Sequence, residues 1–299
     1  MHPDSLLIAG TGALATLFAY RLAQAGVDVT VLGTWREGLL ALQRDGARLA
    51  GVERSAAVRV AEKPQDCRAA KFALVLVKAW QTGRVAGQLA DCLPEDGLAL
   101  TLQNGLGNQE TLIRALREAR VGLGVTTLGA NLIEPGLVQA GGDGPILLEK
   151  GARLAPLQAM LVAAGFQVEV MEDARSFVWG KLVVSAAINP LTALLRVPNG
   201  AILERPQARH LMGELAQETA EVARSRAIRL PFNSAEEAVE QVARRTADNR
   251  SSMLRDVLRG AQTEIDAING AVVRLGDESG VAVPTNRLIW ALVKALAAP

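Results

Sequence analysis

Aromatic residues and cysteines are scarce in this chain, and each scarcity excludes a class of structure or chemistry. Aromatics make up 3% of the 299 residues, so the core that the 49% of hydrophobic residues can build is mainly aliphatic. The two cysteines, Cys67 and Cys92, form no C-x-x-C pair and have no histidine nearby, which argues against a redox motif or a zinc site. A reduced, cytosolic protein is therefore the simplest expectation.

An excess of charge of one sign is also missing. The 32 basic residues nearly balance the 31 acidic residues, and a formal charge of +1 gives no reason to expect a nucleic acid or a membrane surface as partner. No apolar run approaches the roughly 18 residues needed to span a bilayer. The first apolar stretch runs directly into a glycine loop, unlike the core of a signal peptide.

The first part of the chain alternates short apolar runs with helical patterns. Near-continuous apolar runs predict strands that are covered on both faces, namely LLIAG, VDVTVL, FALVLV (72–77) and LALTLQ (98–103). A helix is expected over Ala13–Ala25, a hairpin inserted in the sheet over 47–60, a β-rich segment over 121–148, and a last strand at FQVEV. This alternation predicts a Rossmann-type, doubly wound α/β domain over residues 1–171.

The rest of the chain, residues 172–299, has no strand pattern and predicts an all-α domain. Long Ala, Leu, Arg and Glu stretches predict helices over 206–226, 234–247, 253–275 and 285–298, punctuated by prolines. The apolar faces of these helices are compatible with a homodimer as well as with a core.

A glycine loop between the first strand and the first helix predicts a dinucleotide site. The loop has the pattern G-x-G-x-x-A and consists of Gly10, Thr11, Gly12, Ala13, Leu14 and Ala15. The first glycine permits a tight turn, and the second lets the backbone approach a pyrophosphate at the helix N-terminus. A chance glycine loop is the alternative, but the strand before it and the helix after it favour a nucleotide.

The end of the second strand favours NADP over NAD. An acidic residue there would bind the ribose 2′-hydroxyl, but the chain has Thr34 and Arg36, with Glu37 slightly later. A hydroxyl and a guanidinium suit a phosphate. Lys78 follows FALVLV at the strand end where ligands bind, and can contact phosphate or ribose. The alternatives are that Arg36 is a solvated first-turn residue and that Lys78 is an ordinary surface lysine.

Histidine is nearly absent. Because hydride transfer from a nicotinamide cofactor to a ketone needs an acid, and histidine is the usual one, the proton donor must be sought among other residues. The two histidines, His2 and His210, are expected to face solvent. Lys181 is expected to open the apolar helical segment WGKLVVSAAINPL, where it is either snorkelling at the helix end or held in a cleft. Ser185 and Asn189 follow at four-residue steps on the same face, which favours a ligand-facing stripe. Asn189 with Pro190 can instead simply end the helix.

Glu264 is a second candidate for the chemistry. It is expected on a long amphipathic helix among apolar residues, where a carboxylate near Lys181 would favour the charged form of that lysine and fix its position. An exposed helix charge is the alternative.

Several segments together resemble the ketopantoate reductase family. The resemblance runs from Leu6 to Ala297 and depends on their order and spacing. The segments are GTGALA at 10–15, LVKAWQT at 76–82, LQNGLGN at 102–108, KLVVSAAINPLTALLRVPNG at 181–200, NRSSMLRD at 249–256, TEIDAINGAVVRLG at 263–276 and GVAVPTN at 280–286.

The resemblance implies a reaction and a set of roles. The family reduces 2-dehydropantoate to pantoate with NADPH, on the way to pantothenate and coenzyme A. By resemblance, Lys181 donates the proton to the carbonyl oxygen, Glu264 lies against the substrate hydroxyl or the lysine, and Asn104 lies near the nicotinamide and the lysine. Substrate contacts would map on Ser185, Asn189, Asn199, Asn249 and Ser252.

One position departs from the family pattern. The family commonly has asparagine where this chain has Ser185, and serine is shorter and donates one hydrogen where an amide donates two. The substitution keeps open a reductase of another 2-keto acid. A non-catalytic NADP-binding redox sensor is a further alternative, against which the joint presence of Lys181, Glu264 and Ser252 argues.

Overall fold

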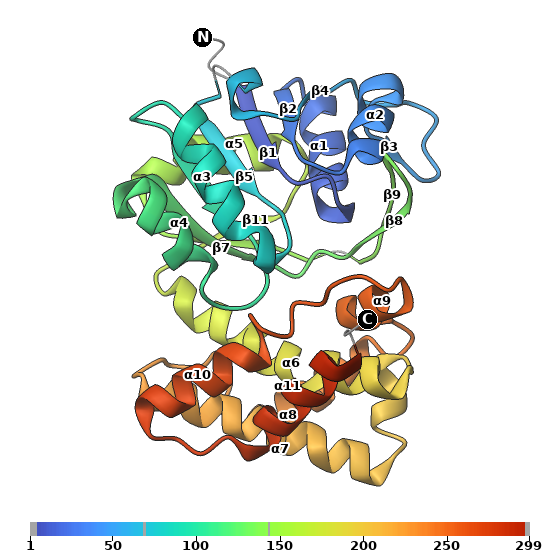
Figure 1. The fold of residues 1–299 in the computed structure, drawn as a ribbon, viewed down its shortest axis with the longest axis vertical. Coiled ribbons are helices and arrows are strands. Elements are labelled where there is room, and N and C mark those ends of the chain that lie inside the picture. The colour runs from blue at the N-terminus through green and yellow to red at the C-terminus, as the bar shows by residue number, and fades with distance from the viewer. Residues whose placement is uncertain (1–4, 68–69, 143, 297–299) are drawn as a thin grey trace. The chain divides into compact units, whose positions relative to one another are not determined.

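The computed structural model describes residues 5–67, 70–142 and 144–296, and the chain divides into two compact units (Figure 1). The α/β unit comprises the chain up to Gln103 together with Asn108–Ala174. The helical unit comprises Asn104–Gly107 and the chain from Arg175 onward. The short segment 104–107 thus belongs by its contacts to the helical unit, although α/β residues flank it on both sides. The functional division into 1–171 and 172–299 stays a prediction.

A large, mainly parallel sheet forms the centre of the α/β unit (Figure 1). Its order is β11-β10-β7-β6-β5-β1-β2-β4, and among the described residues of this sheet only β7 and β10 pair antiparallel. The chain reverses direction across the sheet between β1 and β5, as in a doubly wound fold. The strands are β1 Ser5–Ala9, β2 Asp28–Leu32, β4 Arg59–Ala61, β5 Phe72–Val75, β6 Leu98–Thr101, β7 Val121–Thr126, β10 Ile146–Glu149 and β11 Val168–Met171.

Both faces of this sheet are buried, which confirms the fold class predicted from the near-continuous apolar runs. In β1, Leu6 and Ile8 join one hydrophobic cluster, whereas Leu7 and Ala9 join another on the opposite face. The first cluster includes Phe18 of α1, whose ring stacks on Phe166 at 4.4 Å between centroids. The helices of this unit are α1 Ala13–Gln24, α2 Arg36–Asp45, α3 Thr82–Cys92, α4 Asn108–Leu116 and α5 Ala155–Ala163.

A second, small sheet corrects the predicted hairpin over 47–60. Its strands are β3 Arg48–Leu49, β9 Leu137–Ala140 and β8 Ala130–Glu134, in that order. β3 pairs parallel with β9, whereas β4 pairs parallel with β2 in the large sheet. Ala47 and Ala56 form an isolated bridge between the two arms. The hairpin is therefore wrong, because each arm finds a longer partner strand in a different sheet.

The helical unit contains six helices within its described residues (Figure 1). They are α6 Ala174–Leu195, α7 Pro206–Ser225, α8 Ala235–Arg245, α9 Ser252–Leu258, α10 Asn269–Ser279 and α11 Pro284–Leu296. Short 3-10 turns lie in both units at Pro64–Asp66, Ala79–Gln81, Glu118–Arg120, Ala152–Leu154 and Asn199–Ile202. Residues 175–296 contain no strand, which agrees with the predicted all-α region.

The helix α6 lies at the centre of its unit. Val183 and Ile188 belong to a cluster with α7 and α8, whereas Leu182 and Ala186 belong to a cluster with α10 and α11. By length and composition α6 is apolar enough to cross a membrane, and 61% of an apolar 18-residue stretch of this helix is buried inside the protein. The expectation that no apolar stretch reaches this length is therefore wrong, and packing on two clusters is the position of a core helix.

The predicted helix over 253–275 is two helices. The chain turns after α9, where the backbone N–H of Ala261 donates to the carbonyl of Asp256 at 2.9 Å, and α10 begins only at Asn269. Glu264 lies in the connecting segment. The amphipathic pattern continues across this turn, because the connecting residues Ile265 and Ile268 are also buried.

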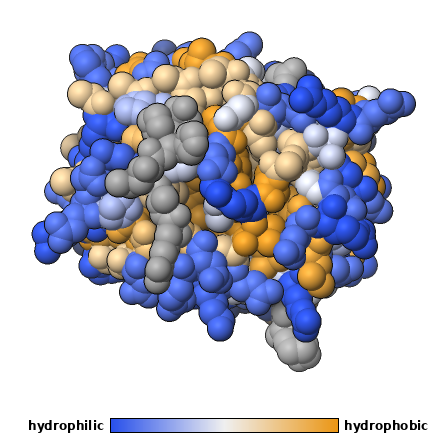
Figure 2. Space-filling model, turned by 90° about the horizontal axis from the view of Figure 1, so that it is seen from above, coloured by the Kyte–Doolittle hydropathy of each residue, from blue (hydrophilic) through white to orange (hydrophobic). Residues whose placement is uncertain are grey.

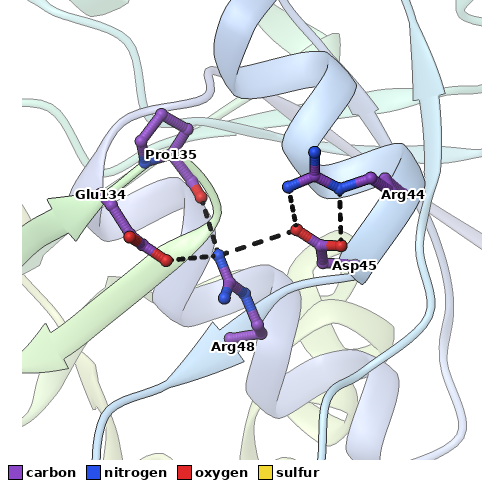
Figure 3. Close-up of polar contacts among 5 residues, drawn as sticks. All are labelled: Arg44, Asp45, Arg48, Glu134 and Pro135. Atoms are coloured by element: carbon purple, nitrogen blue, oxygen red, sulfur yellow. Dashed lines mark hydrogen bonds and ion pairs between the residues drawn. The ribbon is translucent and has the colours of Figure 1, made fainter.

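A cluster of charged side chains holds β3 onto the turn between β8 and β9 (Figure 3). Arg48 donates to a carboxylate oxygen of Glu134 at 3.0 Å and to the carbonyl of Pro135 at 3.1 Å. Asp45, at the end of α2, lies 3.9 Å from the same guanidinium and accepts two hydrogen bonds from Arg44. Arg48 is thus the residue that links α2 to the small sheet.

Apolar side chains also reach the surface. Figure 2 shows one face of the molecule, on which apolar residues gather in patches between hydrophilic residues.

On α11, Leu288, Leu292 and Leu296 are exposed by 59%, 44% and 45%. These leucines recur every four residues, so they form an apolar stripe along the solvent-exposed side of α11.

Replacing Arg48 by methionine is expected to lower the free energy of unfolding by about 1 kcal/mol, because Glu134 and the Pro135 carbonyl lose a charged donor. Chemical denaturation measures the change. The control is Arg44→Met, which removes an arginine whose side chain is 78% exposed and should leave stability nearly unchanged. An unchanged free energy of unfolding in Arg48→Met would show that the link through Arg48 adds no stability.

Candidate functional site

The turn after β1 is pressed against the backbone that follows β5. Gly10 has a φ of +131°, and a Cβ on it would lie 3.1 Å from the carbonyl carbon of Leu76. Any side chain there would push the two loops apart, so glycine is required. The loops after β1 and β5 meet at the point where the strand order reverses, which is where doubly wound sheets bind ligands.

The N-terminus of α1 is open above this turn. Gly12 is the N-cap residue and has no side chain that could cap the helix N–H groups. The space where a Cβ would stand is open. Thr11 and Ala15 are buried, whereas Gly12 is exposed and Ala13 and Leu14 are half-buried. Free backbone N–H groups at a helix start, with room beside them, suit a pyrophosphate. The predicted loop therefore leaves an open helix start, and its role as a dinucleotide site stays a prediction.

The predicted phosphate and ribose residues lie on either side of this loop. Thr34 and Arg36 are exposed, and follow β2 at the start of α2. Lys78 is half-buried and follows β5, just before a 3-10 turn. Because β2 and β5 both flank β1, these side chains belong to the strand ends that border the glycine turn. The structure thus gathers the predicted cofactor residues of the α/β unit at neighbouring strand ends.

A polar network at the end of β6 was missed by the reasoning from sequence. Gln103 donates to the carbonyl of Val77 at 2.9 Å and to the hydroxyl of Thr82 at 2.8 Å, and Thr82 donates to Asn108 at 2.8 Å. The network ties the loop after β5 to the starts of α3 and α4. The motif LQNGLGN contains two of these residues, but their partners are too distant in sequence to be identified.

Asn104 lies against the segment that carries Glu264. Its side-chain amide donates to Glu264 Oε2 at 3.4 Å, and the N–H of Leu106 donates to the carbonyl of Ala267 at 2.9 Å. Gly105 has a φ of +78°, and a Cβ on it would lie 2.5 Å from the Ala267 oxygen. Residues 104–107 therefore dock closely on the residues before α10, and only glycine fits at 105.

Lys181 and Glu264 are brought together within the helical unit. Lys181 lies well inside α6 and is half-buried, so it neither opens the helix nor snorkels at its end. Glu264 is 6% exposed, which excludes the alternative of an exposed helix charge. Burial lowers the pKa of Lys181 to about 8, and the charge of Glu264 acts in the opposite direction.

The predicted polar stripe lies on a helix that continues past Pro190. Lys181, Ser185 and Asn189 are half-buried at successive turns, while most residues between them are buried. The helix continues through Pro190 to Leu195, so the alternative that Asn189 and Pro190 end it is wrong. The three polar side chains therefore lie on one face of a continuous helix.

Two of the predicted substrate residues meet through the backbone. The N–H of Asn199 donates to the carbonyl of Asn249 at 3.0 Å, and the buried side-chain amide of Asn199 donates to Thr246 at 2.9 Å. The Oδ1 of Asn199 is buried without a hydrogen-bond partner among the described residues. Asn249 itself is exposed. Asn199 thus has an acceptor that a further donor can use.

The start of α9 is organised by Ser251, which the sequence reasoning passed over in favour of Ser252. Ser251 is the buried N-cap, accepts from the N–H of Leu254 at 3.0 Å, and lies 2.7 Å from the hydroxyl of Thr192 on α6. Ser252 is the half-buried first residue of the helix. A serine just before an apolar helix is the signal that could have identified the cap.

No metal centre is found in the described part of the chain, where no three histidine, cysteine or acidic side chains lie together. His210 is exposed on α7, as expected, and His2 lies outside the described residues.

Comparison with known proteins gives two family matches and close structural neighbours. Residues 6–153 match the model "Ketopantoate reductase PanE/ApbA", and residues 173–297 match its C-terminal counterpart. The 2-dehydropantoate 2-reductase of Archaeoglobus fulgidus is 38% identical over 302 residues, with 98% of both chains covered. That of Pyrobaculum aerophilum is 37% identical, with 97% of both chains covered.

Two solved structures share the whole fold. A PanE/ApbA family ketopantoate reductase from Ralstonia eutropha JMP134 has a TM-score of 0.92 at 30% identity, with 98% of both chains covered. D-mandelate dehydrogenase with NADH and anilino(oxo)acetate has a TM-score of 0.91 at 25% identity, with the same coverage. Because the two family models together span most of the sequence and the relatives match over nearly its full length, the chain belongs to the ketopantoate reductase family.

Proposed function

We propose that this chain reduces 2-dehydropantoate to pantoate with NADPH, in the biosynthesis of pantothenate and coenzyme A. The observation that carries the proposal is the grouping of Lys181, buried Glu264 and Asn104 in the helical unit. A proton donor, a carboxylate that stabilises its charged form and an amide are the groups that reduction of a ketone requires beside a hydride source.

The cofactor would be held by the α/β unit. The N–H groups at the start of α1 and the open space at Gly12 fit the pyrophosphate, and Thr34 and Arg36 offer a hydroxyl and a guanidinium to a 2′-phosphate. Lys78, after β5, offers a second positive charge. Bound NADPH supplies the hydride that reaches the carbonyl carbon of the substrate.

Lys181 would supply the proton. Its ammonium donates to the carbonyl oxygen as negative charge develops there. A pKa of about 8 keeps the side chain mostly protonated at neutral pH, yet makes it a stronger acid than an ordinary lysine. Glu264 supports the charged form, and Asn104, bonded to Glu264 Oε2 at 3.4 Å, orients that carboxylate.

The remaining predicted residues would bind the substrate. Ser252 and nearby amides are suited to hold the carboxylate at the start of α9. Asn199 has a buried acceptor without a partner among the described residues, and the hydroxyl of 2-dehydropantoate is a donor that fits it. Ser185, Asn189 and Asn249 would complete the set, with Ser185 and Asn189 on the face of α6 that also carries Lys181.

A reductase of another 2-keto acid is the second candidate. Ser185 leaves more room than the asparagine common in the family, and a structure of D-mandelate dehydrogenase, bound to NADH and anilino(oxo)acetate, shares the whole fold. A larger side group on the keto acid would fill the space beside a serine. The mechanism at Lys181 and Glu264 would be unchanged.

Two finer statements stay predictions, namely a homodimer and a cytosolic location. The apolar stripe of Leu288, Leu292 and Leu296 on α11 is a described surface that suits a contact between two copies.

The choice between the two candidates is tested by following NADPH and NADH oxidation by absorbance with a panel of 2-keto acids. We expect the largest kcat/KM with 2-dehydropantoate and NADPH, because the site has the family's donor set apart from Ser185. Turnover confined to an aromatic 2-keto acid would establish the second candidate. Tight NADPH binding without any turnover would favour the sensor.

Replacing Arg36 by alanine is expected to narrow the preference for NADPH over NADH by roughly 10-fold, because a charged hydrogen bond to the 2′-phosphate is lost. The ratio of the two kcat/KM values measures the effect. Arg44→Ala removes an exposed arginine from the other end of α2 and serves as the matched control. An unchanged ratio in Arg36→Ala would move phosphate recognition to other residues.

The rate of turnover is expected to fall as pH rises above about 8, the pKa of Lys181, because the protonated lysine is the donor. In Glu264→Gln the fall should begin at a lower pH, since the carboxylate that raises this pKa is gone. Profiles of kcat/KM against pH, which report the pKa values of the free enzyme, measure the fall in each protein. Lys181→Ala is the control and should lose turnover while NADPH binding persists. If turnover falls at the same pH in Glu264→Gln as in the unaltered protein, the pairing of Lys181 with Glu264 is contradicted.

A further inference from the structure

Pro190 leaves a gap in the hydrogen bonding of α6. In an α-helix each N–H donates to the carbonyl four residues earlier, so residue 190 would normally serve Ala186. Proline has no N–H, and the carbonyl of Ala186 therefore lacks its partner within the helix. Ala186 is fully buried, where water cannot replace the missing donor. An unpaired carbonyl at this depth costs roughly 1–3 kcal/mol.

The missing donor comes from Asn269. Its side-chain amide donates to the Ala186 carbonyl at 3.0 Å, and the same nitrogen donates to Asn286 Oδ1 at 2.9 Å. Asn269 is the first residue of α10 and is itself fully buried. One asparagine therefore completes the interrupted helix from a different part of the chain.

The other members of the network connect Asn269 to two further helices. Asn286 donates to Glu218 Oε2 at 2.8 Å and to the carbonyl of Leu215 at 3.2 Å. The carboxylate of Glu218 also accepts from the backbone N–H groups of Thr285 and Asn286, each at 2.8 Å. Through Asn286, the amide of Asn269 is thus connected to α7 and to the start of α11.

The same contact joins the two elements that carry Lys181 and Glu264. Ala186 directly follows Ser185 and lies about one turn beyond Lys181 on α6. On the other side, the N–H groups of Ala267 and Ile268 donate to the Glu264 carbonyl at 3.0 and 3.1 Å, which forms a turn that leads straight into Asn269. The bond from Asn269 to Ala186 therefore joins the Lys181 helix to the Glu264 segment.

We propose that Asn269 is a positioning residue for the reduction, which sets the spacing of Lys181 and Glu264 by occupying the carbonyl that Pro190 leaves open. The proposal rests on the proposed function for the step it serves. Pro190 and Asn269 act as a pair, because the proline keeps the Ala186 carbonyl available and the asparagine uses it to join α6 to α10.

Four proteins separate positioning from stability, namely the unaltered chain, Asn269→Ala, Pro190→Ala and the double variant. Asn269→Ala should lower kcat roughly 10- to 100-fold with a smaller change in KM, because a small displacement of reacting groups is costly. The Kd for NADPH should not change, because the glycine loop belongs to the α/β unit. Asn269→Ala should also lower the melting temperature, since a buried carbonyl loses its donor.

The double variant gives the decisive result. With alanine at position 190 the helix again has an N–H for the Ala186 carbonyl, so the melting temperature should recover toward that of Pro190→Ala alone. The kcat should stay low, since α6 and α10 remain unlinked. Recovery of kcat together with the melting temperature would overturn the proposal and leave Asn269 as a residue for stability only.

Asn286→Ala is the matched control. It removes another fully buried asparagine of the same network but keeps the bond from Asn269 to Ala186. It should lower the melting temperature and change kcat much less than Asn269→Ala does. An equal loss of kcat in both variants would assign the effect to the network as a whole and not to the contact with α6.

A chemical measurement tests whether Asn269 positions Lys181 against Glu264, even if the proposed reaction is wrong. Acetylation of Lys181 by acetic anhydride at one fixed pH, followed by mass spectrometry, reports how much of its amine is neutral. Lys181 should react faster in Asn269→Ala and in the double variant, because a lysine no longer held against Glu264 is less protonated. Lys150, exposed in the α/β unit, is the internal reference. An unchanged Lys181 rate would overturn the proposal, whereas absent turnover of all 2-keto acids would overturn the reaction alone.

Discussion

The helical unit depends on satisfying one buried carbonyl, that of Ala186. The helix α6 packs on both hydrophobic clusters of the unit, so it cannot end or bend away at Pro190 without exposing them. The amide of Asn269 supplies the donor that Pro190 lacks, and through Asn286 and Glu218 it connects α10 to α11 and α7. A polar network that is satisfied at almost every atom can specify one arrangement of an otherwise aliphatic core.

Much of the α/β unit could be predicted from the sequence, because its signals are local. Buried parallel strands read as continuous apolar runs, and the glycine turn lies between a strand and a helix that both have clear patterns. The prediction failed over 47–60, because the two arms pair with other parts of the chain, β3 with β9 and β4 with β2. It also failed over 253–275, because apolar residues such as Ile265 and Ile268 keep the helical pattern through a segment that is not helical.

The candidate site was predictable to a lesser degree. The stripe of Lys181, Ser185 and Asn189 follows from helical spacing alone, whereas the grouping of Lys181 with Glu264 and Asn104 came from the family resemblance. The partners of Gln103, the cap at Ser251 and the role of Asn269 could not be inferred from spacing. Each depends on a hydrogen bond between residues that the fold brings together from distant parts of the sequence.

The docking of residues 104–107 on the residues before α10 has a consequence for how this family can be divided. The helical unit is not a continuous piece of sequence, since it includes four residues that lie inside the α/β half of the chain. A fragment that begins at residue 175 would lack Asn104 and would leave the Ala267 carbonyl without the donor it has from Leu106. An exchange of the C-terminal helices of this chain for those of a relative would preserve these contacts only if the tetrapeptide still fitted the new helices, since the two separate stretches form one packing unit.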